Sequence, residues 1–219
     1  MHLTVQNLIN IKKEINLNLP DLKSNKMPKI IAVSKTFSMD KITPLIEYGH
    51  LDFGENKVQE AMEKWSDVKL GKSNLKLHLI GGLQTNKVKY AVKLFDYIHS
   101  VDSEKLAKKI SEEQIKQNKK VKVFIQVNIG NEDQKFGVDK SLVPELCNYC
   151  KTLDLEVVGL MCIPPLNEPS EIYFKEMSEL NKKLNFKELS MGMSSDYLNA
   201  IKNSATYVRI GSSIFGKRN

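Results

Sequence analysis

Cysteine, arginine and long apolar runs are all scarce in this 219-residue chain. Its three cysteines, Cys147, Cys150 and Cys162, are too few for the disulfide framework of a small secreted domain. Cys147 and Cys150 form a C-x-x-C motif late in an expected helix, and no second pair completes a zinc site. We therefore interpret the cysteines as ordinary structural residues and expect no bound metal.

A membrane span and a targeting signal are also missing from the pattern. No stretch reaches the roughly 18 apolar residues that a transmembrane helix needs. Residues 1–15 combine Lys12, Lys13 and Glu14 with regularly spaced apolar residues, which is typical of an amphipathic helix. Neither the apolar core of a signal peptide nor the acid-free composition of a transit peptide is present. The sequence predicts an N-terminal helix and a cytoplasmic protein without membrane association.

The positive charge is carried almost entirely by lysine. The formal net charge is +7, yet Arg209 and Arg218 are the only arginines. Lysines alternate with acids along expected helices, as between residues 105 and 119, and form no long basic block. Such spacing is typical of solvated helix faces and not of a nucleic-acid-binding surface. We expect no specific nucleic-acid binding, although weak attraction to polyanions is compatible with the charge.

After the N-terminal helix, strand and helix signals alternate along the whole chain. Strand signals lie near residues 29–34, 51–54, 75–80, 97–101, 121–127, 156–161, 188–191 and 206–210. Helical stretches lie near residues 40–48, 58–68, 86–94, 103–117, 141–153, 169–184 and 194–202, and a short piece follows near 213–215. Such alternation predicts a parallel sheet covered by helices, and eight strands are the number that closes a (β/α)8 TIM barrel.

An open, doubly wound sheet is the competing architecture. It would normally carry a glycine-rich phosphate loop after its first strand. Here that place holds Ser34, Lys35, Thr36 and Phe37, without glycine. The length and the 41% apolar content suit one substantial core. The sequence therefore predicts a single (β/α)8 barrel domain over residues 1–219, with the N-terminal helix added.

Lys35 ends the first expected strand, an apolar run that begins at Ile30. In an α/β barrel, residues at the C-terminal ends of the strands form the active site. Desolvation at this position would lower the pKa of the lysine and free its amine to form a Schiff base with a carbonyl group. On position alone, a strand-end lysine that reaches to water is the simpler explanation. The last two strands favour the Schiff base.

Strands seven and eight each end in a polar turn. Gly192 and Ser194 follow the seventh strand, and we interpret Ser194 as the N-cap of the next helix. Gly211 and Ser212 follow the eighth strand, where glycine permits a close backbone approach. In α/β barrels, these two loops are the usual phosphate site. Either turn alone is explained as a helix cap, but together they indicate a phosphorylated carbonyl cofactor.

Arg209 lies on the eighth expected strand of a chain that otherwise uses lysine. A rigid and permanently charged guanidinium at the barrel mouth could donate a hydrogen bond to the ring nitrogen of a pyridine. The alternative is a buried structural pair with a carboxylate, and the residue alone does not decide between the two.

Several segments in this order resemble the YggS/PLPBP family of pyridoxal phosphate homeostasis proteins. They are AVSKT at residues 32–36, FGENKVQE at 53–60, HLIGGLQTNK at 78–87, QVNI at 126–129, GLM at 159–161, LSMGMS at 189–194 and VRIGS at 208–212. The resemblance spans nearly the whole chain. It implies the barrel of fold-type III pyridoxal phosphate enzymes, like the N-terminal domain of alanine racemase.

The resemblance also implies roles for particular residues. It assigns the Schiff base to Lys35, the ring-nitrogen contact to Arg209 and a further cofactor contact to Asn56. It assigns the phosphate to Ser194, Gly211 and Ser212, and it places His78 and Met161 at the barrel mouth. Gly82, Lys57 and Phe136 depart from the residues common in the family, which bears on partner or ligand detail rather than on the cofactor.

Two functions follow from this resemblance. The first is a carrier or buffer that holds pyridoxal 5'-phosphate and supplies it to pyridoxal-phosphate-dependent apoenzymes. The second is a racemase-like enzyme, which would need another acid or base from a second domain. The sequence ends at Asn219, soon after the eighth strand, and the guanidinium of Arg209 cannot protonate the ring nitrogen. We therefore expect a non-catalytic, monomeric carrier; recipient enzymes and release trigger stay open.

Overall fold

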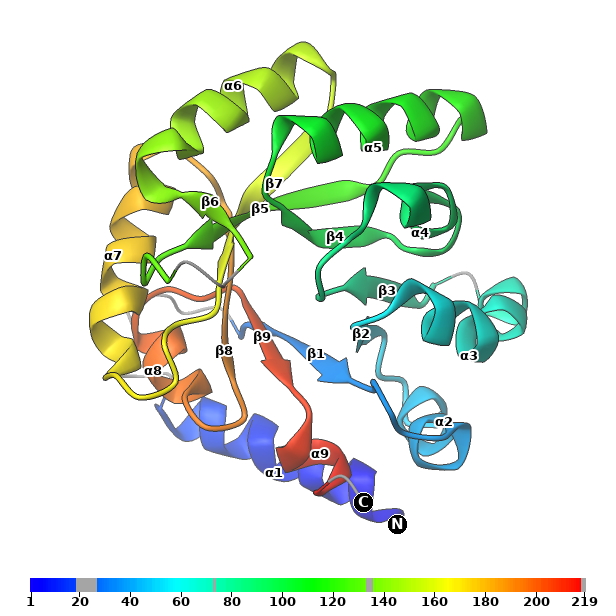
Figure 1. The fold of residues 1–219 in the computed structure, drawn as a ribbon. Coiled ribbons are helices and arrows are strands. Elements are labelled where there is room, and N and C mark those ends of the chain that lie inside the picture. The colour runs from blue at the N-terminus through cyan, green and yellow to red at the C-terminus, as the bar shows by residue number, and fades with distance from the viewer. Residues whose placement is uncertain (19–26, 73, 133–135, 218–219) are drawn as a thin grey trace.

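Eight parallel strands close into a barrel, as the alternating pattern predicts (Figure 1). The computed structural model describes residues 1–18, 27–72, 74–132 and 136–217. The strand order is β4-β3-β2-β1-β9-β8-β7-β5, and pairing of β4 with β5 closes the ring. The strands are β1 (Lys29–Val33), β2 (Asp52–Glu55), β3 (Lys76–Leu79), β4 (Tyr97–Val101), β5 (Lys122–Asn128), β7 (Glu156–Cys162), β8 (Glu188–Met193) and β9 (Tyr207–Ile210). The predicted (β/α)8 barrel is confirmed.

Helices surround the ring of strands (Figure 1). They are α2 (Met39–Glu47), α3 (Val58–Gly71), α4 (Val88–Leu94), α5 (Glu104–Gln117), α6 (Val143–Thr152), α7 (Ser170–Lys183), α8 (Tyr197–Lys202) and α9 (Ser212–Phe215), with single 3-10 turns at η2 (Thr85–Lys87) and η3 (Lys140–Leu142). Helix α5 shows how local sequence sets the limits. The Ser103 hydroxyl accepts from the Leu106 amide at its start, and Asn118 ends it in the left-handed conformation, with φ 46°.

The predicted N-terminal helix is present as α1 (Leu3–Asn18). It buries Val5, Leu8, Ile11 and Ile15 along one face, as the apolar spacing requires. The Asn7 side chain donates a hydrogen bond to the Ile214 carbonyl, so α1 lies against α9 (Figure 1). No helix in the described ranges is long and apolar enough to cross a membrane.

One short strand was not expected from the sequence. Strand β6 (Val138–Asp139) pairs with the end of β5, where Val127 lies opposite Val138. Gln134 and Lys135, which precede Phe136 in the sequence, lie outside the described residues, as do residues 19–26 between α1 and β1.

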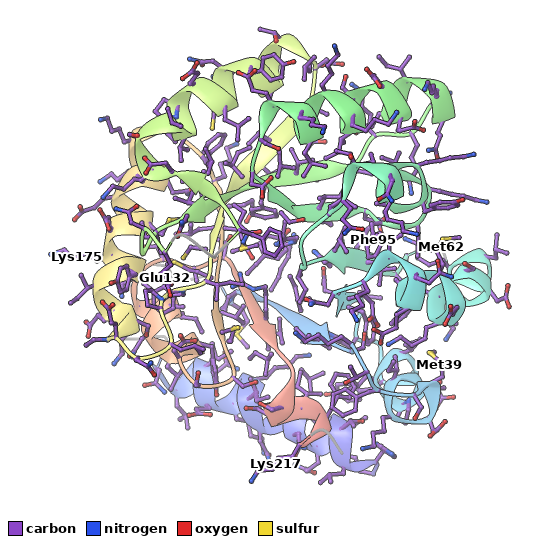
Figure 2. All side chains as sticks on the ribbon, viewed as in Figure 1. Met39, Met62, Phe95, Glu132, Lys175 and Lys217 are labelled. Atoms are coloured by element: carbon purple, nitrogen blue, oxygen red, sulfur yellow. The ribbon has the colours of Figure 1, made fainter. Side chains whose placement is uncertain are left out.

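Side chains alternate between the inside of the barrel and the surrounding helices. In β2, Phe53 packs against Trp65 of α3, whereas Gly54 faces inward, where a Cβ would lie 2.7 Å from Ile31 Cγ2. Ile31 belongs to an apolar interior cluster with Phe124, Met161 and Tyr207. Side chains fill the centre of the ring, while Lys175 of α7 points outward (Figure 2). The interior of the ring is therefore a packed core and not a pore.

Candidate functional site

A cavity of ≈ 330 Å³ opens at the C-terminal ends of the strands. Its apolar walls include Val33, Phe37, Ile80, Ile163 and Met193. The structure brings all six residues that the sequence singles out to this one cavity, namely Lys35, Asn56, Ser194, Arg209, Gly211 and Ser212. A mostly apolar pocket of this size with a few converging polar groups is typical of a small-molecule or cofactor site.

Lys35 follows the last residue of β1 and is half-buried at the cavity wall. The next residue, Thr36, has φ 68°, an unusual value for a β-branched residue. This turn is held from outside the barrel, because the Thr36 amide donates to Glu60 and the Lys64 ammonium donates to the Ser34 carbonyl at 2.9 Å. The backbone on both sides of Lys35 is therefore fixed by charged side chains of α3.

Glu55, Glu60 and Lys64 form an acid–lysine cluster behind this turn. Glu55 is fully buried, and its Oε1 lies 2.8 Å from Lys64 Nζ. The same oxygen accepts from the Ser34 hydroxyl at 2.7 Å and from the Trp65 indole at 3.0 Å. Burial raises the pKa of Glu60, but the hydrogen bond from Lys64 and the nearby amide outweigh it and lower that pKa overall. Sequence reasoning missed this cluster.

Asn56 reaches the cavity only because residue 81 is glycine. A Cβ at Gly81 would lie 2.3 Å from the backbone oxygen of Asn56 and 2.8 Å from its side-chain Cγ. Real Cβ atoms do not approach other atoms so closely, since the overlap would force the backbone apart. The glycine thus lets the ends of β2 and β3 come together around Asn56.

Ser194 does not cap a helix, contrary to the sequence prediction. Helix α8 begins at Tyr197, and the preceding Asp196 accepts from the Met193 amide at 2.7 Å. The Ser194 hydroxyl instead accepts from the amides of Gly211 at 3.2 Å and Ser213 at 3.3 Å. Two backbone N–H groups from the β9 end and one hydroxyl from the β8 end therefore converge on one point.

Arg209 is buried, with 4% of its surface exposed. Its Nη1 donates to the Ser190 hydroxyl at 2.8 Å and its Nη2 to the Cys162 carbonyl at 2.8 Å. Burial lowers the pKa of the guanidinium. An arginine in a protein nevertheless keeps its proton at neutral pH. Within the described part of the chain, no carboxylate forms a direct ion pair with Arg209. The alternative left open by the sequence, a buried pair of Arg209 with a carboxylate, therefore does not explain its position.

His78 and Met161 do not lie at the barrel mouth, so this expectation is wrong. Both are fully buried and neither lines the cavity. His78 contacts Asp52 and His99 inside the barrel, and Met161 packs in the interior apolar cluster. Their side chains lie inside the barrel instead.

The three residues that depart from the family pattern lie together. Gly82, Lys57 and Phe136 line a neighbouring cavity of ≈ 600 Å³, which shares Asn56 with the first. A Cβ at Gly82 would lie 3.3 Å from the exposed ring of Phe136. The cavity that contains Lys35 is lined by none of the three.

The cysteine thiols are buried and unpaired with one another. Burial raises the pKa of Cys147 to about 11 and that of Cys150 to about 12. Across the described ranges, no group of three acidic, histidine or cysteine side chains is arranged to hold a metal ion.

Comparison with known proteins gives the class of this barrel. The family model described as "Alanine racemase, N-terminal domain" matches residues 12–219. Alanine racemase of Clostridium difficile has a similar fold, with a TM-score of 0.69 over 94% of this chain and 56% of that chain, but only 17% identity. This likeness extends to the fold alone.

More similar relatives define the family within that class. The chain is 40% identical to the pyridoxal phosphate homeostasis protein of Aquifex aeolicus over 87% of each chain, and 37% identical to the human one over 87% of this chain and 77% of that protein. The structure of PipY from Synechococcus elongatus with PLP bound superposes with a TM-score of 0.80 and 34% identity, covering 92% of this chain and all of that one. The chain belongs to the pyridoxal phosphate homeostasis protein family, within the alanine racemase N-terminal domain class.

Proposed function

We propose that this protein binds pyridoxal 5'-phosphate through a Schiff base on Lys35 and acts in intracellular pyridoxal phosphate homeostasis as a carrier or buffer. The observation that carries the proposal is the convergence of an amine, a buried guanidinium and a set of anion-binding donors on one cavity. The names of the relatives and the PLP-bound state of PipY support the same assignment.

The donor set fits a phosphate. Ser194 Oγ accepts from the amides of Gly211 and Ser213. A phosphate oxygen could take the place of this hydroxyl as acceptor, and the hydroxyl could then donate to the phosphate. Ser212, whose side chain is exposed at the cavity rim, offers a second hydroxyl. Asn56 would contact the cofactor from the opposite wall.

Lys35 would provide the covalent anchor and Arg209 the contact to the ring nitrogen. When bound, pyridoxal phosphate supplies an aldehyde that condenses with a primary amine. The cluster on α3 fixes the backbone that carries this amine. Because a guanidinium gives up no proton near neutral pH, Arg209 would hold the ring nitrogen without protonating it.

This contact favours a carrier over a racemase-like enzyme. An unprotonated pyridine nitrogen withdraws electrons weakly, so carbanion chemistry at a bound amino acid is poorly supported. We further propose that the carrier is a cytoplasmic monomer that passes its cofactor to pyridoxal-phosphate-dependent apoenzymes. Racemase activity is the alternative that the experiment must address.

An absorbance spectrum followed by borohydride reduction tests the function. Protein mixed with pyridoxal phosphate should show a near-visible band that borohydride abolishes, and peptide mass spectrometry should find the reduced adduct on Lys35. An adduct on another lysine, or no band at all, would refute the assignment. Racemase turnover approaching the enzyme median of about 10 s⁻¹ on a common amino acid would instead establish the enzyme.

A further inference from the structure

Four consecutive hydrogen bonds run through the inside of the barrel from Arg209 towards the opposite end. Arg209 Nη1 lies 2.8 Å from Ser190 Oγ, and Ser190 Oγ lies 2.9 Å from His99 Nδ1. His99 Nε2 lies 3.0 Å from His78 Nδ1, and His78 Nε2 lies 3.0 Å from Asp52 Oδ1. We call these five residues the interior network. It joins β9, β8, β4, β3 and β2.

The acceptor-only carboxylate of Asp52 and the neutral state of two buried imidazoles determine the direction of the bonds. Asp52 can only accept, so His78 carries its proton on Nε2 and donates to Asp52. A neutral His78 then accepts at Nδ1 from His99 Nε2–H, and a neutral His99 accepts at Nδ1 from the Ser190 hydroxyl, which itself accepts from Arg209. Both imidazoles are then Nε2–H tautomers, and all four bonds point away from Arg209.

The surroundings of the network are aromatic. The His78 ring stacks on Tyr97 at 4.4 Å between centroids, and the His99 ring stacks on Phe124 at 4.3 Å. Tyr207 meets His99 edge-on at 6.1 Å. Hydrogen bonds in such a low-dielectric environment are strong when every group is satisfied, and breaking one leaves a costly unpaired group.

The charged groups near the network agree with this protonation. Burial lowers the pKa of His78 and holds that of His99 well below its ordinary value, with the positive charge of Arg209 acting in the same direction on His99. Burial alone would raise the pKa of Asp52, but its bond to His78 and the nearby Lys29 and His50 lower it overall. Asp52 therefore remains an anion at neutral pH.

We propose that Ser190, His99 and His78 are positioning residues that hold Arg209 against the cofactor ring, with Asp52 as its remote counter-ion. This inference rests on the proposed function, because it takes Arg209 as the ring-nitrogen contact. Nη1 and Nη2 are bound to Ser190 and to the Cys162 carbonyl, so the guanidinium plane is fixed while its edge faces the cavity. Arg209, which forms no direct ion pair among the described residues, thereby keeps its place in the core.

Nitrogen-15 NMR of the cofactor-free protein tests the network without reference to pyridoxal phosphate. His78 and His99 should both show the Nε2–H tautomer and remain neutral from pH 8 to pH 6. An Nδ1–H tautomer or a protonated ring at either residue at neutral pH would overturn the one-way arrangement.

Variants test the effect on the cofactor. His99→Leu and Ser190→Ala should each weaken pyridoxal phosphate binding about tenfold and shift the absorbance band. Ser190→Ala removes the hydroxyl that accepts from Arg209, and His99→Leu removes the acceptor that orients this hydroxyl. His99→Gln should restore most of the affinity, because its amide oxygen can accept from Ser190 while its NH₂ group donates to His78. Asp52→Asn keeps an acceptor but removes the charge. Its affinity for pyridoxal phosphate should therefore lie between that of the His99→Leu and Ser190→Ala variants and that of the wild type.

A matched control lies next to His99 on the same strand. The Ser100 hydroxyl is buried and finds no partner among the described residues, so Ser100→Ala should change neither affinity nor spectrum. A second control uses deazapyridoxal phosphate, in which C–H replaces the ring nitrogen. The network variants should scarcely change its affinity, because Arg209 has no ring acceptor to contact there.

The outcomes separate this inference from the proposed function. Failure of the wild type to bind pyridoxal phosphate would refute the function. Normal wild-type binding, with His99→Leu weakening pyridoxal phosphate and the deaza analogue equally, would show that the network stabilises only the fold. Unchanged binding by both His99→Leu and Ser190→Ala would equally refute the positioning role.

Discussion

The two walls of the cavity are built from different interactions. On the β1–β2 side, the turn that carries Lys35 is fixed by the charges of the buried Glu55 and the partly buried Glu60 and Lys64. On the β8–β9 side, Ser194 meets backbone N–H groups, and all of these donors and acceptors are neutral. Charged side chains of α3 fix the first wall, whereas hydrogen bonds between a hydroxyl and backbone amides of the wall itself fix the second.

This difference suits two different tasks. A covalent anchor must present its amine at a constant place, and breaking a buried charge pair costs about 3–5 kcal/mol. A group that binds and leaves must exchange partners cheaply, and a neutral hydrogen bond contributes only about 1 kcal/mol net. We call the β1–β2 side, which carries Lys35, the lysine wall, and the β8–β9 side, which carries the proposed phosphate site, the phosphate wall. We infer that the lysine wall stays in place while the phosphate wall exchanges its hydrogen-bond partners.

Removing the anchor should have the largest effect. Lys35→Ala should abolish the borohydride-stable adduct completely, while the phosphate wall retains weak, reversible binding. Mass spectrometry after reduction measures the first effect and equilibrium dialysis the second. Lys57→Ala, next to Asn56 but lining the neighbouring cavity, is the control and should keep the adduct. A full adduct in Lys35→Ala would contradict the division between the walls.

Breaking the acid–lysine cluster should destabilise the whole barrel. Lys64→Met leaves the buried carboxylate of Glu55 without its cation, and we expect the free energy of unfolding in urea to fall by about 3–5 kcal/mol. Lys120→Met removes a lysine from an exposed pair with Asp154 and should cost less than about 1 kcal/mol. Equal losses in the two variants would mean that the cluster is no stronger than a surface pair.

Two adjacent glycines offer a sharper comparison. Gly81→Ala places a Cβ against the backbone of Asn56, and overpacking of this kind costs about 1–3 kcal/mol. Gly82→Ala meets only the exposed ring of Phe136, which can move aside, so its stability should change little. Thermal unfolding and cofactor affinity of the two variants measure the difference. Indistinguishable variants would show that the fit around Asn56 is loose.

The smallest effect is expected at the phosphate wall. Ser194→Ala removes one hydroxyl but leaves the amides of Gly211 and Ser213, so we expect about a tenfold loss of affinity for pyridoxal phosphate. Pyridoxal, which has the aldehyde but no phosphate, should bind the variant and the wild type alike. A similar loss for both compounds would place Ser194 at the ring instead of the phosphate.

The fold and the grouping of Lys35, Ser194, Arg209, Gly211 and Ser212 could be predicted because both follow from periodicity and strand ends, whereas Asn56 was assigned by the family resemblance alone. Apolar runs separated by helical patterns give the strands, and parallel strands bring their C-terminal ends to one rim. Lys35 and Gly211 follow the ends of β1 and β9, which pair directly, so their proximity needs no further information.

The depth of a side chain in the barrel could not be predicted in the same way. The resemblance places His78 and Met161 at the mouth, but the tilt and stagger of the strands decide the layer that each residue occupies. The prediction that Ser194 is an N-cap was wrong. The carboxylate of Asp196, two residues later, accepts from the Met193 amide, and the helix begins only at Tyr197. The pairing of Glu55 with Lys64 depends on how α3 packs on β2, which no local spacing shows.

The pairing of β1 with β9 has a consequence for synthesis of the chain. Lys29 to Ala32 lie opposite Tyr207 to Ile210, so the first strand to leave the ribosome waits for the last strand of the barrel. At about 5–20 residues per second, this interval lasts roughly ten to forty seconds. Helix α1 likewise waits for α9, to which Asn7 is bonded. In the proposed binding mode, the nascent chain therefore exposes Lys35 well before the turns after β8 and β9 exist, and we expect no retention of the cofactor until translation has passed Ser213.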